Sequence, residues 1–279
     1  MPGMAERGPS RRSPVALHRV RRIDTEGSAD EQDELVVEEP LEIRLDDDPL
    51  AVLMRTPGHD IDLAVGFLFS EGVLRSPDQL DLVEYCADVE ADAMGNVVRV
   101  VAPEADRGAA EAARRDVYAS SSCGLCGKTT IDAVRLLAPP LSPPPPLPAS
   151  LLIDLPRRLR EAQSLFARTG GLHAAGLCAV DGTLELARED IGRHNAVDKV
   201  LGARARDGVW PLTGRILVLS GRASFEMVQK AAMAGIGAVV SVSAPSSLAV
   251  DYAAEVGMTL AGFVRGDRLN VYAGEVTDE

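Results

Sequence analysis

The second half of the chain alternates between short apolar segments and amphipathic segments, and this alternation strongly constrains the fold. Apolar stretches predict strands at residues 174–180, 183–187, 215–219, 238–242, 258–264 and 269–272. The segments around and between them predict helices at residues 156–168, 196–203, 225–234 and 248–255. Such alternation favours a mixed, mostly parallel sheet in a three-layer α/β/α arrangement. Asp181-Gly182 joins the first two strands and predicts an antiparallel hairpin at one edge.

A proline-rich run at residues 139–148 separates this α/β domain, residues 149–279, from the rest of the chain. Consecutive prolines favour an extended conformation, which predicts a semi-rigid linker or loop. Residues 39–138 form a predicted α+β domain with strands at 41–45, 50–54, 80–87 and 96–101. Its helix is predicted to start with Asp60 as the N-cap and to end near Gly72. We expect residues 1–38, basic and then acidic, to be a flexible tail.

Composition is that of an ordinary globular protein, with 46% apolar and 25% charged residues among 279. The net charge of −13 argues against a general nucleic-acid binder, because phosphate binding needs clustered cations. An anionic ligand would therefore need a local basic pocket. No apolar run predicts a membrane span, and Arg11-Arg12 lacks the apolar stretch of an export signal. We expect a cytoplasmic protein, where four cysteines indicate metal or redox chemistry instead of a disulfide framework.

Cys123 and Cys126 form a C-x-x-C pair, and each is followed by glycine. A helical pattern begins just after them and Lys128 is close, so a reactive thiolate is one interpretation. A zinc site, a thiol–disulfide switch and a simple turn are the alternatives. Zinc normally needs two more ligands at recognisable spacing, and only Cys86, Cys178 and four scattered histidines are available. Cys86 and Cys178 lie in apolar strand patterns and are predicted to be buried.

Several polar segments fall in or beside loops of the predicted sheet, where α/β proteins bind ligands beyond the carboxyl ends of strands. These segments are Arg193-His194, Ser220-Gly221-Arg222 and Ser243-Ala244-Pro245-Ser246. Arg193 opens a predicted helix, and with the following backbone N–H groups it could grip a phosphate. His194 and His173 are each candidates either for catalysis or for a hydrogen-bonding role in the structure.

The segment between the last two strands reads Phe263-Val264-Arg265-Gly266-Asp267-Arg268. In structural terms it is a hairpin turn. In functional terms its two arginines suit a pyrophosphate, and Asp267 suits the N1–H and amino donors of guanine. Local sequence leaves both interpretations open.

Taken together, these motifs resemble FdhD, the family of formate dehydrogenase accessory sulfurtransferases. The similarity rests on the cysteine loop and on the segments at residues 56–60, 188–199, 219–227 and 243–247. It extends from about Glu39 to Tyr272 and omits the basic N-terminal tail and the proline run.

The resemblance implies a persulfide on Cys123, received from a cysteine desulfurase and passed to a molybdenum bis-(molybdopterin guanine dinucleotide) cofactor. A molybdenum-dependent formate dehydrogenase would be the client. The resemblance also implies that Phe263–Arg268 binds the cofactor, that GDP-like nucleotides bind, that the second domain has a cytidine-deaminase-like fold, and that the protein is a homodimer. We add Arg193 and His194 to the binding set, and Cys126 would relay or release sulfur.

The deaminase zinc motif H-x-E is absent from the sequence and the C-x-x-C precedes the second domain, so we expect no zinc. Two other functions remain open. A non-catalytic carrier that binds and inserts the cofactor would need the arginine–aspartate segment but not the thiols. A thiol–disulfide oxidoreductase would need both cysteines and no cofactor pocket.

Overall fold

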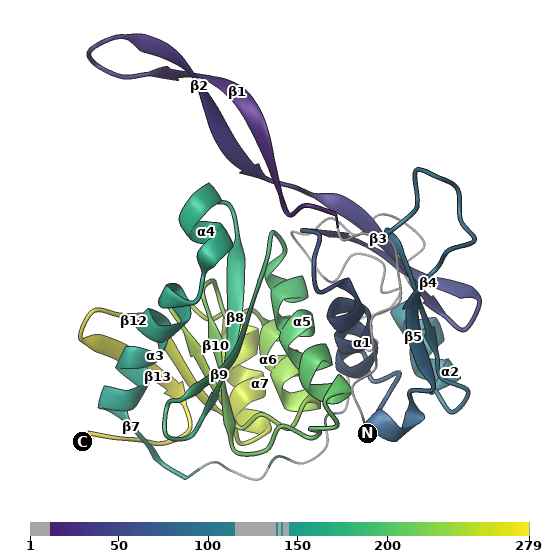
Figure 1. Ribbon diagram of the computed structural model, residues 1–279. Coiled ribbons are helices and arrows are strands. Elements are labelled where there is room, and N and C mark those ends of the chain that lie inside the picture. The colour runs from purple at the N-terminus through teal and green to yellow at the C-terminus, as the bar shows by residue number, and fades with distance from the viewer. Residues whose placement is uncertain (1–11, 115–137, 139–140, 142–144, 279) are drawn as a thin grey trace.

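The computed structural model describes residues 12–114, 138, 141 and 145–278 (Figure 1). Its larger sheet has six strands in the order β13-β12-β11-β10-β8-β9. The strands are β8 (His173–Ala179), β9 (Leu184–Asp190), β10 (Arg215–Leu219), β11 (Ala238–Ser241), β12 (Thr259–Arg265) and β13 (Arg268–Ala273). All six lie where the sequence predicts strands, and the α/β class is confirmed.

Parallel pairing in this sheet is confined to β10–β11 and β11–β12, so the sheet is mixed but less parallel than predicted. Tight turns make β8–β9 and β12–β13 antiparallel. The connection after β9 then places β10 beside β8, and this pair is antiparallel as well. The alternation of strands and helices in the sequence predicts crossover connections, but it does not determine the order of the strands in the sheet.

Helices cover both faces of the large sheet, as predicted. Helix α3 (Ala149–Glu161) lies on one face, and α5 (Arg193–Arg206), α6 (Phe225–Met233) and α7 (Ser247–Glu255) lie on the other. Strand β10 shows why both faces need cover. Ile216 and Val218 belong to the core under α3, whereas Leu217 and Leu219 belong to the core under α5–α7.

The predicted helix at 156–168 is wrong in its limits, because two helices occupy this region. Helix α3 starts earlier, at Ala149, and carries Pro156 in its interior; α4 (Ser164–Thr169) follows as a separate short helix. The carboxylate of Glu189 on β9 accepts hydrogen bonds from the backbone N–H groups of Leu165 and Phe166, at 3.0 and 2.7 Å. This long-range contact satisfies the first N–H groups of α4.

The N-terminal part contains a four-stranded sheet with the order β4-β3-β6-β5. Its elements are β3 (Glu39–Leu45), β4 (Asp48–Arg55), α1 (Asp60–Ser70), the 3₁₀ turn η1 (Pro77–Gln79), β5 (Leu82–Tyr85), β6 (Val97–Val101) and α2 (Arg107–Ala113). The predicted strands and first helix are confirmed, but Asp60 is not the cap. His59 holds the N-cap position in a left-handed conformation, with φ of 57°, and Asp60 pairs with the buried Arg55.

Two glycines let α1 and α5 approach closely and join the two parts of the molecule. A Cβ atom on Gly66 would lie 1.8 Å from the backbone oxygen of Asp198, and one on Gly202 would lie 1.9 Å from that of Asp62. Helix α1 therefore lies between α5 and the small sheet (Figure 1).

The flexible tail predicted for residues 1–38 is a wrong prediction for residues 15–36. Strands β1 (Val15–Ile23) and β2 (Ser28–Val36) form an antiparallel hairpin that extends away from the body (Figure 1). Basic β1 faces acidic β2, with ion pairs between Arg19 and Asp30 and between Arg22 and Glu31, both at 2.7 Å. The two opposite charge runs are thus complementary strands. A parallel pair of short strands, β7 (Leu147–Pro148) and β14 (Val276–Thr277), completes the fold.

Candidate functional site

The carboxyl ends of β9, β10, β11 and β12 lie at one edge of the large sheet. These four strands share a direction, since β10–β12 pair in parallel and β9 is related to β10 through the antiparallel β8. The loops that begin at Ile191, Ser220 and Val242, and the turn after Arg265, therefore share this edge with His173 at the start of β8. The predicted placement of the polar segments at strand ends is confirmed.

A pocket of about 500 Å³ opens at this edge, between helices α3 and α4 and the ends of β8–β11. Polar and aromatic lining residues come from several elements: Arg160, Gln163, Phe166, His173 and Ser220. Pro156, Leu159 and Leu172 are among the apolar lining residues. A pocket of this size, largely apolar with a few convergent polar groups, suits a small organic ligand.

His173 forms one wall of the pocket and lies against the backbone of the next loop. A Cβ atom on Gly221 would be 3.1 Å from His173 Nδ1, so glycine permits this approach. Burial lowers the pKa of His173, and the nearby positive charges of Arg193 and Arg222 lower it further. His173 is therefore a neutral imidazole at pH 7, able both to donate and to accept a hydrogen bond.

His194 and Glu226 connect the starts of two helices at the same edge. His194 Nε2 of α5 lies 2.6 Å from Glu226 Oε2 of α6, and both side chains are largely buried. The carboxylate orients the imidazole and fixes α5 relative to α6. The structure thus gives His194 a positioning contact, which was one of the two roles expected for it.

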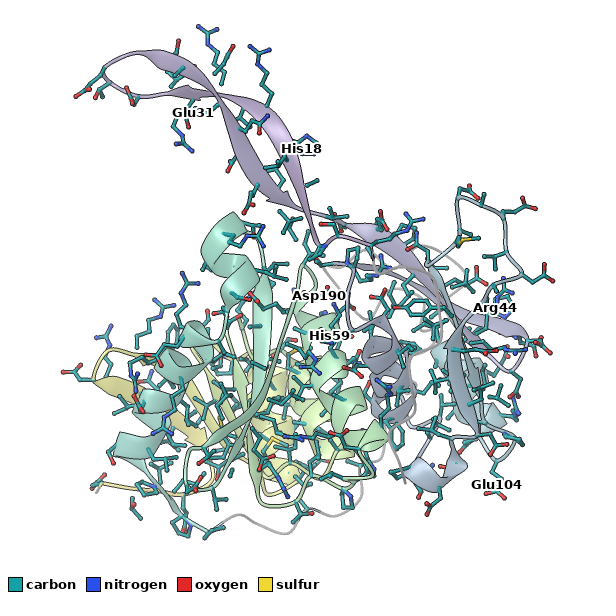
Figure 2. All side chains as sticks on the ribbon, in the orientation of Figure 1. His18, Glu31, Arg44, His59, Glu104 and Asp190 are labelled. Carbon is teal, nitrogen blue, oxygen red and sulfur yellow. The ribbon has the colours of Figure 1, made fainter. Side chains whose placement is uncertain are left out.

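Asp190 is a buried hub that sequence reasoning missed (Figure 2). Its Oδ1 accepts hydrogen bonds from Gly192 N and Asn195 Nδ2, at 2.7 and 2.9 Å. Its Oδ2 accepts one from Thr56 N at 3.1 Å and lies 2.6 Å from Lys199 Nζ. One carboxylate therefore joins the start of α5 to the loop before α1. The signal in the sequence was Lys199, which follows Asp198 between the apolar pairs Ala196-Val197 and Val200-Leu201; a lysine among such neighbours indicates a buried partner.

Phe263–Arg268 contains the end of β12, the β12–β13 turn and the first residue of β13, so the interpretation of this segment as a hairpin turn is correct. Arg265 pairs with Arg268 across the turn, Gly266 has φ of 60°, and Phe263 has the unusual φ of 52° for a non-glycine residue. Arg265, Asp267 and Arg268 are exposed, but the Val264 side chain is 1% exposed and belongs to the core under α3. A ligand can therefore contact the side chains of Arg265, Asp267 and Arg268, but only the backbone of Val264.

The structure brings the predicted site residues into two groups. Arg193 and His194 follow β9 and lie near His173, at the start of β8, and Arg222, after β10. Phe263–Arg268 lies at the end of β12 and the start of β13. Strand β12 is four strands away from β9 in the sheet order, or about 19 Å at the usual strand spacing. A single phosphate cannot contact both groups, whereas an elongated dinucleotide can reach across such an edge.

Cys123 and Cys126 lie outside the described residues. Of the two described cysteines, Cys178 is fully buried, as predicted, and burial raises the pKa of its thiol to about 11. Cys86 is only partly buried, because it follows β5 instead of lying within it, so its predicted burial is wrong. Within the described part of the chain, no group of three or more His, Cys, Asp or Glu side chains is arranged to hold a metal ion.

Comparison with known proteins identifies the family. The family model described as FdhD/NarQ matches residues 36–277. The chain belongs to the FdhD/NarQ family. A relative named sulfur carrier protein FdhD from Streptomyces coelicolor is 53% identical over 261 residues, covering 92% of this chain and 93% of its own. A relative of the same name from Mycobacterium tuberculosis is 48% identical over 266 residues, covering 92% and 96%.

A solved structure shows the same fold. It is a crystal structure of a protein described as a formate dehydrogenase accessory protein, from Desulfotalea psychrophila. The two chains superpose with a TM-score of 0.72 at 24% identity, covering 94% of this chain and 97% of the other. None of the helices in the described residues is long and apolar enough to cross a membrane.

Proposed function

We propose that this member of the FdhD/NarQ family is a sulfurtransferase that carries sulfur as a persulfide on Cys123 and delivers it to a molybdenum bis-(molybdopterin guanine dinucleotide) cofactor. The donor would be a cysteine desulfurase, the client a molybdenum-dependent formate dehydrogenase, and the active form a homodimer. The observation that carries the proposal is 53% identity, over 92% of the chain, to a relative named as a sulfur carrier. The C-x-x-C pair supplies thiols for such chemistry.

The proposed chemistry starts with attack of the Cys123 thiolate on the terminal, sulfane sulfur of the donor's persulfide. The donor's S–S bond breaks, its thiolate leaves, and Cys123 becomes Cys–S–SH. Attack by the Cys126 thiolate on Cys123 Sγ would then release hydrosulfide and leave a Cys123–Cys126 disulfide, which a cellular thiol must reduce. Alternatively, the Cys126 thiolate attacks the terminal sulfur of the Cys123 persulfide, the Cys123 thiolate leaves, and Cys126 relays the sulfur to the cofactor.

The sheet edge provides local cations for an anionic cofactor on a chain with a net charge of −13. Arg265 and Arg268 stand exposed on either side of the β12–β13 turn, and Arg193 and Arg222 lie near the other end of the edge. In this proposal the arginines of the turn bind the pyrophosphate and Asp267 binds the guanine.

The test of sulfur transfer is mass spectrometry of Cys123 after incubation with a cysteine desulfurase and cysteine. We expect the peptide that contains Cys123 to gain one sulfur atom, which dithiothreitol removes, and to gain none when the donor is omitted. A tightly bound zinc ion, with Cys123 and Cys126 protected from alkylation until a chelator is added, would refute the persulfide mechanism.

Guanine recognition predicts that GDP binds more tightly than ADP, because one carboxylate can accept hydrogen bonds from both N1–H and the amino group of guanine. Asp267→Ala should reduce this preference about tenfold, since a hydrogen bond to a charged group contributes roughly 1.5–3 kcal/mol. Calorimetric titration of each protein with GDP and with ADP measures this preference. Asp251→Ala on α7 is the matched control, because Asp251 is also exposed but lies on a helix away from the turn. Equal affinity of the unmodified protein for GDP and ADP would remove the guanine assignment.

A further inference from the structure

The pocket between α3, α4 and the large sheet has no role in the proposed function so far, although it adjoins the β12–β13 turn. Arg265 Nε donates a hydrogen bond to the backbone oxygen of Val242 at 2.8 Å, and Val242 also lines the pocket. Ser243 O accepts from Phe263 N at 3.0 Å. The proposed guanine site and the pocket therefore share the end of β11.

A stacked pair of flat groups stands among the pocket residues. The guanidinium carbon of Arg160 lies 4.0 Å from the centroid of the Phe166 ring. In the described part of the chain no carboxylate pairs with Arg160, whereas its neighbours Arg157 and Arg158 on α3 both pair with Asp154. An arginine that lies over an aromatic ring and has no acidic partner is available to an anionic or aromatic ligand.

The sheet side of the pocket offers neutral hydrogen-bonding groups. Ser220 Oγ accepts from Ala174 N at 2.8 Å, which leaves its O–H to donate to a ligand. His173 is neutral, and Gln163, only 5% exposed, lines the pocket as well. The pocket combines hydrogen-bond donors and acceptors, apolar lining residues, an arginine and an aromatic ring. This combination matches a heterocycle that has polar edges and carries a phosphate.

We propose that this pocket binds the pterin end of the guanine dinucleotide, with the fused ring against Phe166 and Arg160 and its phosphate near Arg160. This inference rests on the proposed function, because it assigns the second end of the same ligand. His173 on β8 is three strands from β12, or roughly 14 Å along the sheet edge. A pyrophosphate-linked dinucleotide lying along the carboxyl ends of the strands then has one ring at each site.

Neopterin monophosphate is a fluorescent probe for this pocket, and its binding can be followed by fluorescence titration of the full chain. Arg160→Met should weaken binding about tenfold, because a charge-assisted contact is lost while the apolar stem remains. Phe166→Leu should weaken it as well, through the loss of the ring face. Arg157→Met is the matched control, since Arg157 is on the same helix, exposed, and does not line the pocket.

The outcomes separate this inference from the proposed function. We expect the probe to bind the unmodified protein and Arg157→Met equally. Absence of probe binding, or equal probe affinity in Arg160→Met and the unmodified protein, would overturn the pterin assignment. Competition between GDP and the probe for one site would overturn it too, since both rings would then use the same pocket. None of these results depends on persulfide formation at Cys123, which is measured separately.

Discussion

Replacing Cys123 by serine should abolish activation of a formate dehydrogenase by this protein, while its melting temperature stays within about 1 °C. Sulfane sulfur is carried in an S–S bond, and a serine oxygen does not form the equivalent reversible bond under these conditions. The loss should therefore be complete rather than partial, because the proposed chemistry has no second route that avoids Cys123. Client activity in cells that lack the endogenous protein is the readout, with thermal unfolding as the test of folding.

Cys86→Ser is the matched control for this experiment. Cys86 is partly exposed, like a reactive thiol, but burial raises its pKa, so the thiol form predominates at pH 7. Activation by Cys86→Ser should equal that of the unmodified protein. Normal activation by Cys123→Ser would favour the carrier that binds and inserts the cofactor without thiol chemistry.

Gly66→Ala should destabilise the protein by about 3 kcal/mol or more, the upper end of the usual cost of overpacking. The added Cβ would lie 1.8 Å from the backbone oxygen of Asp198 and 2.9 Å from Gly202 N. Both neighbours are main-chain atoms of α5, so no flexible side chain can move aside. The two helices would have to separate, and Ser70 of α1 would lose its hydrogen bond to the buried Asp198 of α5.

Gly108→Ala in α2 is the matched control for this helix contact. A Cβ there would meet only Asp106 Oδ1, at 3.4 Å, which is an ordinary contact. Alanine is the better helix former by roughly 0.5–1 kcal/mol, so this variant should be as stable as the unmodified protein or slightly more so. Urea unfolding measures the free energy of unfolding of both variants. A Gly66→Ala protein that unfolds at the same urea concentration as the unmodified chain would show that the close approach of α1 and α5 is not required.

Local pattern in the sequence was enough to predict most elements of the large sheet. The strand predicted at residues 215–219 is β10, and the Asp181-Gly182 turn joins β8 to β9. The polar segments at strand ends were also recognised. Periodicity and turn chemistry act over a few neighbouring residues, so they survive in the sequence without knowledge of the fold. The family resemblance rested on the same short motifs.

Other features could be seen only in the tertiary structure, because they depend on contacts between residues far apart in the chain. The charged residues at 15–36 indicated a tail until their register showed opposite charges facing each other across a hairpin. Glu189 accepts hydrogen bonds from the first N–H groups of α4, and Asp190 joins Thr56 to Lys199. The pocket beside Arg160 is likewise made by α3, α4 and strand ends that meet only in the folded chain. The packing free energy of such contacts depends on which elements meet, and the sequence of one segment does not specify its partner.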